Sequence, residues 1–378
     1  MQQRFGRQGV RGRRRVLAAA VALGLGAAWL APGPAQAQAA KPLKKVTIAL
    51  GGVTVLNVTY PWLMMPVALD YWKSEGYDVQ VIAAPGSVQA VQQLATGNVD
   101  FAQVSSNVAI QANVTNNIPA RVVMNNSVID WAIAVPSEGS IQRVADLKGQ
   151  RIGIVSLASG GLPLLRSLLK ANGLDPDKDV NIIPTGAGAP ALEALRSGRV
   201  QGLMFWNAAI AGFENAGAKL RLLRSPDWAR MPDFSLATLQ RTIDRDLAMV
   251  EAIARGAAKA SLYAVTNPAC VRQLHWARFP ETKPTGGDEA TLARWDEHLL
   301  ATQVSSMKAA FEMNGGKLWG RATPEAFGRM QDFMLDAGLI ERKLAPATFV
   351  VGSEGFFERV NGFDAQAVVR QAQACAKS

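Results

Sequence analysis

The sequence predicts an α/β protein built of two similar lobes, and three observations lead to that prediction. Residues 78–104 align without gaps on residues 179–205, so the chain contains one unit twice. Each copy reads as strand, helix and strand, which is the building unit of a parallel sheet. Of the 378 residues, 49% are hydrophobic and 19% are charged, which is typical of a globular chain of about two domains. This composition excludes a disordered, collagen-like or disulfide-dense protein.

The two copies share residues at the positions where such a unit needs them. Seven of the 27 aligned positions are identical: Asp78, Val79, Ile82, Ala90, Leu94, Gly97 and Val99 match Asp179, Val180, Ile183, Ala191, Leu195, Gly198 and Val200. The first copy predicts a strand at 79–83, a break at Pro85 and Gly86, a helix that Gly97 ends, and a strand at 99–104. The second predicts a strand at 179–183, a loop at 184–188, a helix at 190–196 and a strand at 200–205.

Each copy is preceded by one more strand and one more helix. Residues 45–50 and 151–155 predict strands, followed by helices at about 61–74 and from about 161 to 171. Strands joined through helices run parallel with right-handed crossovers. Ligands of such sheets bind beyond the carboxyl ends of the strands. Two lobes with facing carboxyl edges therefore predict a cleft between them.

The rest of the chain predicts a hinge and a helical extension. Strands at 130–135 and 234–239 are expected to cross between the lobes as a two-stranded hinge. We expect lobe one to comprise residues 40–134 with 240–378, and lobe two residues 135–239. The extension reads as helices at about 244–265, 289–313, 323–337 and 364–376.

The net charge of +10 belongs largely to the N-terminus. Six Arg residues and no acidic residue lie within residues 1–39, so the remainder carries about +4, too mild to indicate nucleic-acid binding. The Arg-rich start, the apolar run at 16–31 and small-residue sites around Ala37 predict a cleavable signal peptide over 1–39, with an uncleaved anchor as the alternative. Arg13-Arg14-Arg15 resembles a twin-arginine signal, and the general secretory route stays open. A periplasmic location is expected.

Cysteine and histidine are scarce. Cys270 and Cys375 are the two cysteines, and the sequence leaves open whether they pair or lie buried and inert. The two histidines, His275 and His298, stand at no metal-ligand spacing, and no phosphate-binding loop occurs. Neither a metal nor a cofactor is therefore expected.

Three motifs resemble the periplasmic solute-binding proteins of the nitrate/sulfonate/taurine type, a group that includes binders of thiamine-pyrimidine precursors. They are LATGNVDFA at 94–102, DLKGQRIGI at 146–154 and ALEALRSGRVQG at 191–202. The resemblance implies the two-lobed periplasmic-binding-protein fold (type II). It also implies a monomer that captures a small molecule by hinge closure and delivers it to the permease and ATPase subunits of an ABC importer. Such proteins catalyse nothing.

The ligand is expected to be neutral or anionic, such as a sulfonate, a carboxylate or a pyrimidine-like molecule. The family usually has Trp-Asp where this chain has Trp206-Asn207, and an amide both donates and accepts hydrogen bonds. The cleft-facing loops carry hydroxyl, amide and Gly residues and no Lys or Arg, which argues against phosphate. The candidate ligand-binding residues are Thr54, Asn57, Tyr60, Ser87, Ser105, Ser106, Ser159, Gly160, Thr185, Gly186, Trp206 and Asn207.

Each candidate also has a structural interpretation. Ser105 and Ser106 suit a helix cap, Gly86 and Gly186 suit turns, and Trp206 suits the core. Two other functions remain open: a sensor that binds a ligand without feeding a transporter, and an enzyme on the same fold, such as a desulfinase or a thiamine-pyrimidine synthase. Either enzyme needs Cys or His in the cleft, whereas Cys270 and His275 fall in the helical extension.

Overall fold

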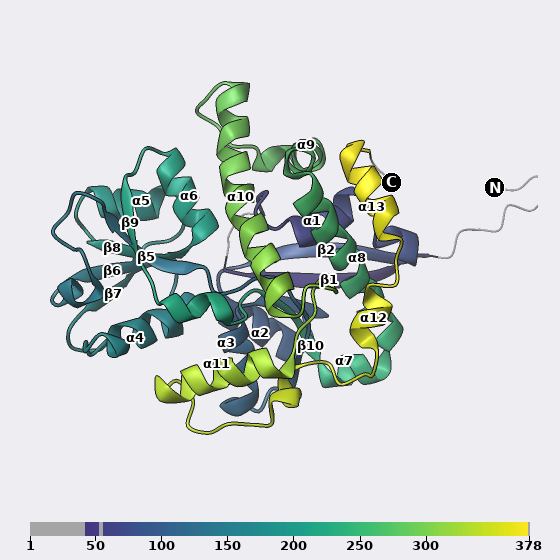
Figure 1. The fold of residues 1–378 in the computed structure, drawn as a ribbon, viewed down its shortest axis with the longest axis horizontal. Coiled ribbons are helices and arrows are strands. Elements are labelled where there is room, and N and C mark those ends of the chain that lie inside the picture. The colour runs from purple at the N-terminus through teal and green to yellow at the C-terminus, as the bar shows by residue number, and fades with distance from the viewer. Residues whose placement is uncertain (1–41, 53–55, 377–378) are drawn as a thin grey trace, which may run out of the picture. The chain divides into compact units, whose positions relative to one another are not determined.

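A computed structural model describes residues 42–52 and 56–376 of the chain, and the predicted signal peptide lies outside this part. The described chain contains two five-stranded mixed sheets (Figure 1). Sheet one has the order β2-β1-β3-β10-β4, made of β1 (Lys44–Gly51), β2 (Tyr77–Ala84), β3 (Phe101–Val104), β4 (Ala120–Asn125) and β10 (Ser235–Leu239). Sheet two has the order β7-β6-β8-β5-β9, made of β5 (Trp131–Pro136), β6 (Arg151–Ile154), β7 (Asn181–Pro184), β8 (Gly202–Trp206) and β9 (Leu220–Leu223).

The two sheets have the same topology, which confirms the predicted two-lobed α/β fold. In sheet one, β1 is parallel to β2 and β3, while β10 is antiparallel to β3 and β4. In sheet two, β6 is parallel to β7 and β8, while β5 is antiparallel to β8 and β9. We call the part built around sheet one lobe one and the part built around sheet two lobe two.

The internal repeat coincides with equivalent elements of the two lobes. Its first copy contains β2, α2 (Ser87–Thr96) and β3, and its second contains β7, α5 (Ala189–Arg196) and β8. The glycines that end the two helices, Gly97 and Gly198, have φ of 78° and 71°. Glycine adopts this left-handed conformation without steric cost, so it ends both helices at the same point of the repeat.

The remaining helices of the two lobes follow the predicted strand–helix alternation. They are α1 (Pro61–Ala68) and α3 (Ser106–Val114) in lobe one, and α4 (Gly161–Ala171) and α6 (Asn207–Asn215) in lobe two. Short 3-10 turns occur at Lys73–Glu75, Val144–Leu147, Pro226–Arg230, Pro280–Thr282 and Pro346–Phe349. The predicted helix over 61–74 ends at Ala68, because Asp70 takes a left-handed φ of 53° and turns the chain.

The two crossings between the lobes lie antiparallel and are joined by backbone hydrogen bonds. The N–H of Ile129 donates to Met231 at 3.0 Å, and the N–H of Asp233 donates to Ser127 at 2.9 Å. A single antiparallel bridge joins Val128 and Pro232 between these bonds. Strand pairing places β5 in sheet two from Trp131 onward and β10 in sheet one from Ser235 onward, whereas the predicted lobe boundaries follow residues 134 and 239.

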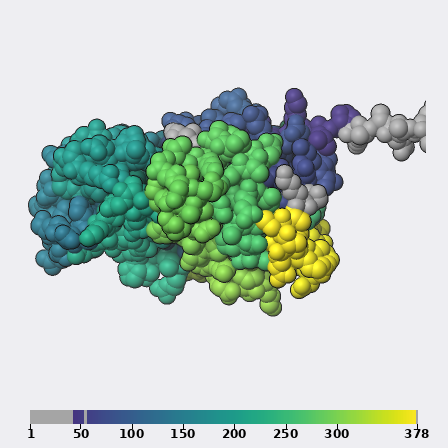
Figure 2. All heavy atoms as spheres, turned by 90° about the horizontal axis from the view of Figure 1, so that it is seen from above, coloured from purple at the N-terminus to yellow at the C-terminus, as the bar shows by residue number. Residues whose placement is uncertain are grey.

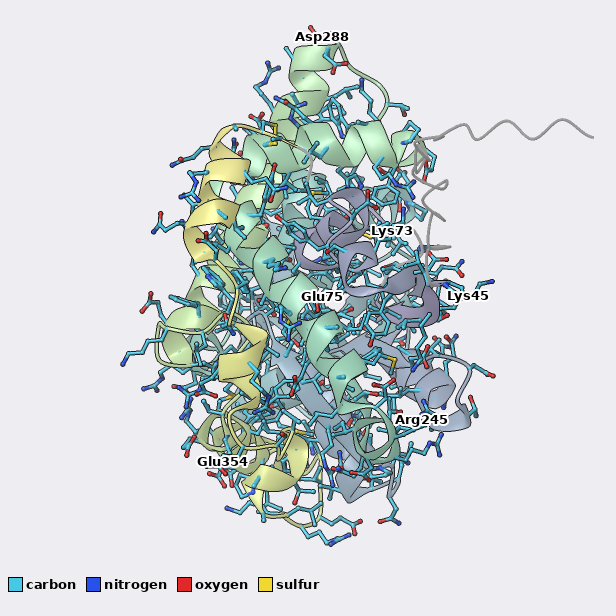
Figure 3. The ribbon with its side chains drawn as sticks, turned by 90° about the vertical axis from the view of Figure 1, so that its right-hand side faces the viewer. Lys45, Lys73, Glu75, Arg245, Asp288 and Glu354 are labelled. Atoms are coloured by element: carbon cyan, nitrogen blue, oxygen red, sulfur yellow. A yellow bond between two sulfur atoms is a disulfide. The ribbon has the colours of Figure 1, made fainter. Side chains whose placement is uncertain are left out.

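Helices make up most of the chain after β10, as predicted. They are α7 (Gln240–Arg245), α8 (Leu247–Thr266), α9 (Pro268–Arg278), α10 (Glu289–Met313), α11 (Pro324–Asp336), α12 (Phe356–Val360) and α13 (Ala365–Gln373). α8 packs on α1, where the indole Nε1 of Trp72 donates to the carbonyl of Ile253 at 2.9 Å. Glu75 pairs with Arg255 and Lys259 of α8, on the face of lobe one that Figure 3 shows.

The helical extension also contacts lobe two. α10 packs against α6, and the side chain of Asn215 donates to the carbonyl of Trp295 at 3.0 Å and pairs with His298 at 2.9 Å. In Figure 2 the green residues around α10 lie against the teal residues of lobe two. The Nζ of Lys170 donates to the carbonyl of Ala337 at 2.9 Å, just after α11. The extension, which the sequence assigns to lobe one, therefore contacts both lobes.

Cys270 and Cys375 form a disulfide, which resolves the alternative that the sequence leaves open. It joins α9 to the residues just after α13. His275 lies buried nearby in α9, and burial lowers its pKa to about 4, so it is a neutral core residue. Within residues 42–52 and 56–376, no helix is both long enough and apolar enough to cross a bilayer.

Candidate functional site

The carboxyl ends of the parallel strands of the two sheets face each other, and the loops that follow them touch. The Nδ2 of Asn107 in lobe one donates to the carbonyl of Gly160 in lobe two at 2.9 Å. The hydroxyl of Ser156 donates to the carbonyl of Pro85 at 2.9 Å, and the N–H of Val88 donates to Ala158 at 3.3 Å. These contacts close one side of the cleft.

Two glycines allow this close approach of the lobes. A Cβ on Gly160 would stand 2.3 Å from the hydroxyl oxygen of Ser105, and a Cβ on Gly86 would stand 2.4 Å from the carbonyl oxygen of Ala158. Gly86 has an extended backbone that any residue adopts, with φ of 179°. The sequence context of Gly86 indicated a turn. Its lack of a side chain instead permits contact between the lobes.

Beside these contacts lies a small, tightly packed cavity of about 210 Å³, gaps between atoms included, whose walls come from both lobes. Its lining residues are Gly51, Gly52, Tyr60, Ser87, Ser105, Trp131, Ser159, Gly160, Trp206 and Phe234. They end or follow β1, β2, β3, β6 and β8, or begin or precede β5 and β10. None of these ten residues is Lys, Arg, His or Cys, so the polar part of the lining consists of Ser hydroxyls and backbone groups.

Four of the lining residues form what we call the aromatic box: Tyr60, Trp131, Trp206 and Phe234. The rings of Trp131 and Trp206 are 5.4 Å apart between centroids and tilted by 60°. The ring of Phe234 lies 6.5 Å from each of the other three. All four side chains are buried. Tilted rings at such separations are the ordinary packing of aromatic pairs.

Strand direction explains why two of these rings reach the cavity. β5 and β10 run antiparallel to their neighbours, so they begin at the edge where the parallel strands end. Trp131 is the first residue of β5 and pairs in register with Trp206, the last residue of β8. Phe234 directly precedes β10. Both residues thus come from the hinge crossings and lie between the two lobes.

Behind the aromatic box lie two buried carboxyl groups, one on each hinge crossing. Asp233 is 1% exposed, and its Oδ2 accepts a hydrogen bond from the indole Nε1 of Trp131 at 2.7 Å. Burial, and after it the charge of Asp130, raise the pKa of Asp233 to about 8, although the Ser105 hydroxyl and the Trp131 indole act to lower it.

Asp130 is the second of these groups and is 8% exposed. Burial raises its pKa to about 6, against lowering by the backbone N–H of Asn207, the hydroxyl of Ser306 and the guanidinium of Arg224. Both carboxyls also raise the pKa of the Tyr60 hydroxyl, whose largest perturbation is its own burial. The two carboxyls and Tyr60 therefore form one electrostatically connected group.

A wider groove adjoins the cavity on the other side of Trp206. Its volume is about 1540 Å³ out to open solvent, and Asn57 and Thr59 of lobe one line it together with α5 and α6 of lobe two and Leu299 of α10. Most of its wall is apolar, including Leu192, Phe213 and several Ala and Gly residues. Trp206 separates the groove from the cavity and contributes to both.

The structure brings together most of the residues predicted to bind a ligand. Those lining the cavity are Tyr60, Ser87, Ser105, Ser159, Gly160 and Trp206, while Asn57 lines the adjoining groove. The hydroxyl oxygen of Ser87 accepts from the backbone N–H of Ser105 at 3.1 Å, which fixes the two serines side by side. Thr54 lies outside the described residues.

Four predicted residues lie elsewhere, because three have side chains engaged in other contacts and the fourth is a turn glycine. Ser106 donates to the carbonyl of Asp233 at 2.6 Å, and the Thr185 hydroxyl donates to the carbonyl of Ile154 at 3.2 Å. Gly186 has φ of 74°, which fits its turn interpretation. The Oδ1 of Asn207 accepts from Arg224 at 3.1 Å. None of these four is among the residues lining the cavity or the groove.

Three residues escaped the sequence prediction: Trp131, Phe234 and Asp233. The predicted hinge strands could have pointed to them. A strand that runs antiparallel begins at the edge of the sheet where the parallel strands end, so its first residues lie in the cleft. The prediction considered only loops that follow parallel strands, so it missed the residues that begin the crossings.

Comparison with solved structures shows the same fold in several proteins. The alkanesulfonate-binding protein SsuA of Xanthomonas axonopodis pv. citri, bound to MOPS, has a TM-score of 0.59 and 16% identity over 82% of this chain and 99% of its own. The periplasmic aliphatic sulphonate-binding protein SsuA of Escherichia coli has a TM-score of 0.55 and 15% identity over 85% and 99%. A mutant of the desulfurization enzyme DszB, in complex with biphenyl-2-sulfinic acid, has 0.53 and 15% over 85% and 99%.

Sequence comparison assigns the family. No curated protein matches this chain in sequence. The NMT1/THI5-like family matches residues 63–270, which run from α1 of lobe one through the whole of lobe two into α9. This stretch covers more than half of the 378 residues and includes both hinge crossings and the aromatic box except Tyr60. The chain belongs to the NMT1/THI5-like family.

Proposed function

We propose that this protein is the extracytoplasmic solute-binding component of an ABC importer, which captures a small organic molecule between its lobes. The observation that carries the proposal is the cavity lined by both lobes, whose aromatic and hydroxyl groups are buried when the lobes touch. The NMT1/THI5-like family and the fold shared with sulfonate-binding periplasmic proteins support it. The periplasm, the signal peptide over 1–39, the permease and ATPase partners and the monomeric state belong to the same proposal.

Capture follows from closure of a two-state hinge. A solute that touches both lobes binds the closed state more tightly than the open state and shifts the population toward it. The crossings at 125–131 and 231–235 are short and joined to each other by backbone bonds, so they bend as a unit. Asn107, Ser156 and Val88 supply contacts between the lobes that only the closed state makes.

None of the ten residues that line the cavity is a Cys or a His. A desulfinase or synthase on this fold needs a Cys or His nucleophile or base at the substrate. Cys270 is held in a disulfide in the helical extension, and His275 is buried in α9. The lining therefore supports binding without turnover. A sensor that binds the same solute is the second candidate function.

The charge of the solute is the finer part of the proposal. The preference for a neutral or anionic solute, such as a sulfonate, a carboxylate or a pyrimidine, rested on Asn207 in place of an acid and on the lack of Lys and Arg. Asn207 turns toward Arg224 and lies outside the cavity lining, so its amide does not bear on the charge of the solute. The lack of basic side chains in the lining remains, and it leaves an anion only hydroxyls and backbone N–H groups as partners.

Native mass spectrometry of the protein purified from its own periplasm tests the proposal by detecting a solute carried through purification. Small-angle scattering with that solute at saturation should show a smaller radius of gyration than without it. An unchanged radius contradicts hinge closure, and chemical conversion of the solute by the pure protein contradicts the role of a binder. Release of the solute to membranes that contain the permease, and not to membranes without it, separates a transporter from a sensor.

A further inference from the structure

We infer that the groove beside the cavity selects an organic molecule with an elongated apolar body and one hydrogen-bond-accepting group at its end. The inference rests on the proposed solute-binding role and names the chemical class of the solute. Alkanoates of medium chain length represent this class. The inference also assigns part of the selection to α10, so the helical extension takes part in the site.

The groove has the room that the cavity lacks. The cavity measures about 210 Å³ with the gaps between atoms included, and its aromatic rings pack on one another. The groove measures about 1540 Å³ out to open solvent. Lobe one, lobe two and α10 all contribute residues to its lining. A molecule in the groove therefore touches every part that closure of the hinge would bring together.

The walls of the groove are mostly apolar. Of its sixteen lining residues, twelve are apolar or Gly, and the four polar ones are Asn57, Thr59, Glu193 and Arg196. Glu193 and Arg196 are one acid and one base on the same helix, α5, so together they add no net charge. Removal of apolar surface from water is therefore the main source of affinity that this lining offers.

The groove runs along α6. One face of this helix carries Ala208 and Gly212 and ends at Ala216, and all three residues line the groove. They are four positions apart, so they lie on one side of the helix, where their small size leaves space above the backbone. The distance from the first to the third is about 12 Å at the rise of an α-helix. An extended chain of about eight to ten carbon atoms has a similar length.

Two neighbouring helices flank α6. Leu192 of α5 and Leu299 of α10 line the groove, and α6 lies between these helices in Figure 1. The Nη2 of Arg196 in α5 donates to the carbonyl of Ala216, which joins α5 to the far end of α6. On the other side, the side chain of Asn215 donates to the carbonyl of Trp295 at 3.0 Å, one turn before Leu299. These hydrogen bonds fix the two leucines beside α6.

Asn57 supplies a hydrogen-bond donor at the near end of the groove. Its Oδ1 accepts from the backbone N–H of Thr59 at 3.0 Å and from the Thr59 hydroxyl. The amide oxygen is thus engaged within lobe one, which leaves the amide nitrogen, on the other side of the group, for a solute. Thr59 directly precedes Tyr60 of the cavity lining, so this donor lies at the end that Trp206 shares with the cavity. An acceptor group at this end and an apolar body along α6 match both features.

Isothermal titration calorimetry with a series of alkanoates tests the inference. Butanoate, hexanoate and octanoate share one head group and differ only in the length of the apolar body. Octylammonium keeps the octyl chain but carries a head group that donates hydrogen bonds and accepts none. Each methylene buried in the groove should lower the Kd about threefold, so octanoate should bind about 80-fold more tightly than butanoate. Octylammonium should bind about 10-fold more weakly than octanoate.

Substitutions at Gly212 tie the length preference to the groove. A Cβ on Gly212 would meet no atom within 4 Å, so a side chain there occupies the groove without strain. Gly212→Leu should weaken octanoate binding about 10-fold or more and butanoate binding much less, and Gly212→Ala should fall between. Both variants replace a Gly within α6 by a better helix former, so the fold is retained. Gly352→Leu is the matched control, because Gly352 lies outside the groove and an added Cβ there also meets no atom within 4 Å.

Two more variants test the flanking wall and the donor. Leu299→Ala removes the contribution of α10 and should weaken octanoate binding about threefold to tenfold. Leu335→Ala, at an exposed residue of α11 outside the groove, should leave it unchanged. Asn57→Asp keeps an acceptor for Thr59 but removes the donor, so it should weaken every alkanoate by a similar factor and reverse the preference between octanoate and octylammonium.

The inference is overturned if the Kd does not fall from butanoate to octanoate, or if Gly212→Leu and Gly352→Leu bind octanoate equally well. A short polar solute that co-purifies and compacts the protein in scattering would leave the solute-binding role standing while it removes this class of solute. Absence of compaction with every solute would contradict the role itself. The two proposals therefore fail on different measurements.

Discussion

The amide nitrogen of Asn107, in the second residue of α3, donates to the backbone carbonyl of Gly160 at 2.9 Å, and this hydrogen bond joins lobe one to lobe two. Asn107 is 1% exposed, and the Cα of Gly160 faces the side chain of Ser105. The side-chain amide nitrogen of Asn107 thus finds its partner in the loop that precedes α4 of lobe two. An open cleft removes this partner, so the bond favours closure.

Asn107→Ala should therefore weaken the closed state. Loss of one hydrogen bond between buried groups costs about 1 kcal/mol, which corresponds to roughly a fivefold weaker affinity for the solute that co-purifies with the protein. Calorimetry measures the affinity, and scattering measures the closed fraction. Asn116→Ala is the control, because Asn116 is exposed two residues after α3 ends. Equal affinities of the two variants would show that the bond does not contribute to closure.

Gly160→Ala and Gly86→Ala should hold the lobes apart. The added Cβ would stand 2.3 Å from the Ser105 hydroxyl in the first case and 2.4 Å from the Ala158 carbonyl in the second, distances that only separation of the lobes relieves. We expect compaction in scattering to disappear while the melting temperature changes little, since neither residue lies in the core of a lobe. Gly352→Ala, where an added Cβ has no atom within 4 Å, should compact as the unmodified protein does. Normal compaction of both cleft variants would contradict this account of closure.

Trp206→Ala should weaken binding by about 1–3 kcal/mol, which is roughly 5- to 150-fold in Kd. Its ring is shared by the cavity and the adjoining groove and packs 5.4 Å from Trp131. Trp206→Phe keeps an aromatic face and should recover part of the loss. Calorimetry with the co-purifying solute measures both variants. An unchanged Kd in Trp206→Ala would remove this residue from the binding site.

The stability of the protein should decline as the pH rises from about 4 to about 8, in part because of Asp233. Its pKa is raised from 3.8 to about 8 by burial and by Asp130, so the folded chain binds more protons than the unfolded chain across this window. Such a group contributes stability below its unfolded pKa and loses that contribution as the pH rises through its folded pKa. The maximal slope for one group is about 1.4 kcal/mol per pH unit.

Asp233→Asn removes this dependence, so its free energy of unfolding should fall less steeply between pH 4 and pH 8 than that of the unmodified protein. Urea titrations at several pH values measure the difference. Asp227→Asn should follow the unmodified protein, because Asp227 is exposed. Parallel curves for all three proteins would show that Asp233 titrates in its ordinary range.

Replacing both cysteines, Cys270→Ala with Cys375→Ala, should lower stability without changing solute affinity. The disulfide closes a loop whose ends are 105 residues apart in the sequence, and removing a native disulfide costs about 2–5 kcal/mol. Cys270 lies in α9 and Cys375 just after α13, while the cavity is lined by residues of β-strand edges and loops between 51 and 234. Denaturant unfolding measures the loss. A large change in Kd would connect the extension to the cleft.

The sequence by itself determined the two-lobed α/β fold, because local patterns encode it. Two runs of β-branched residues, each followed by a helix that a glycine ends, recur in the repeat and occupy equivalent places in the two sheets. The loops after the parallel strands could also be predicted to meet, since parallel strands place their carboxyl ends on one edge. Tyr60, Ser87, Ser105, Ser159, Gly160 and Trp206 share one cavity for that reason.

Only the tertiary structure decided what completes the cavity. Trp131 and Phe234 enter it from strands that run antiparallel, and the direction of a strand in a sheet is set by its neighbours and not by its own residues. Asp130 and Asp233 are about 100 residues apart in the chain and come together because the two hinge crossings pair with each other. The amide of Asn207 has the chemistry of a ligand-binding group, yet its oxygen accepts a hydrogen bond from Arg224. The charge of the cleft depends on groups that the fold brings together from distant parts of the chain. No local sequence pattern therefore predicts it.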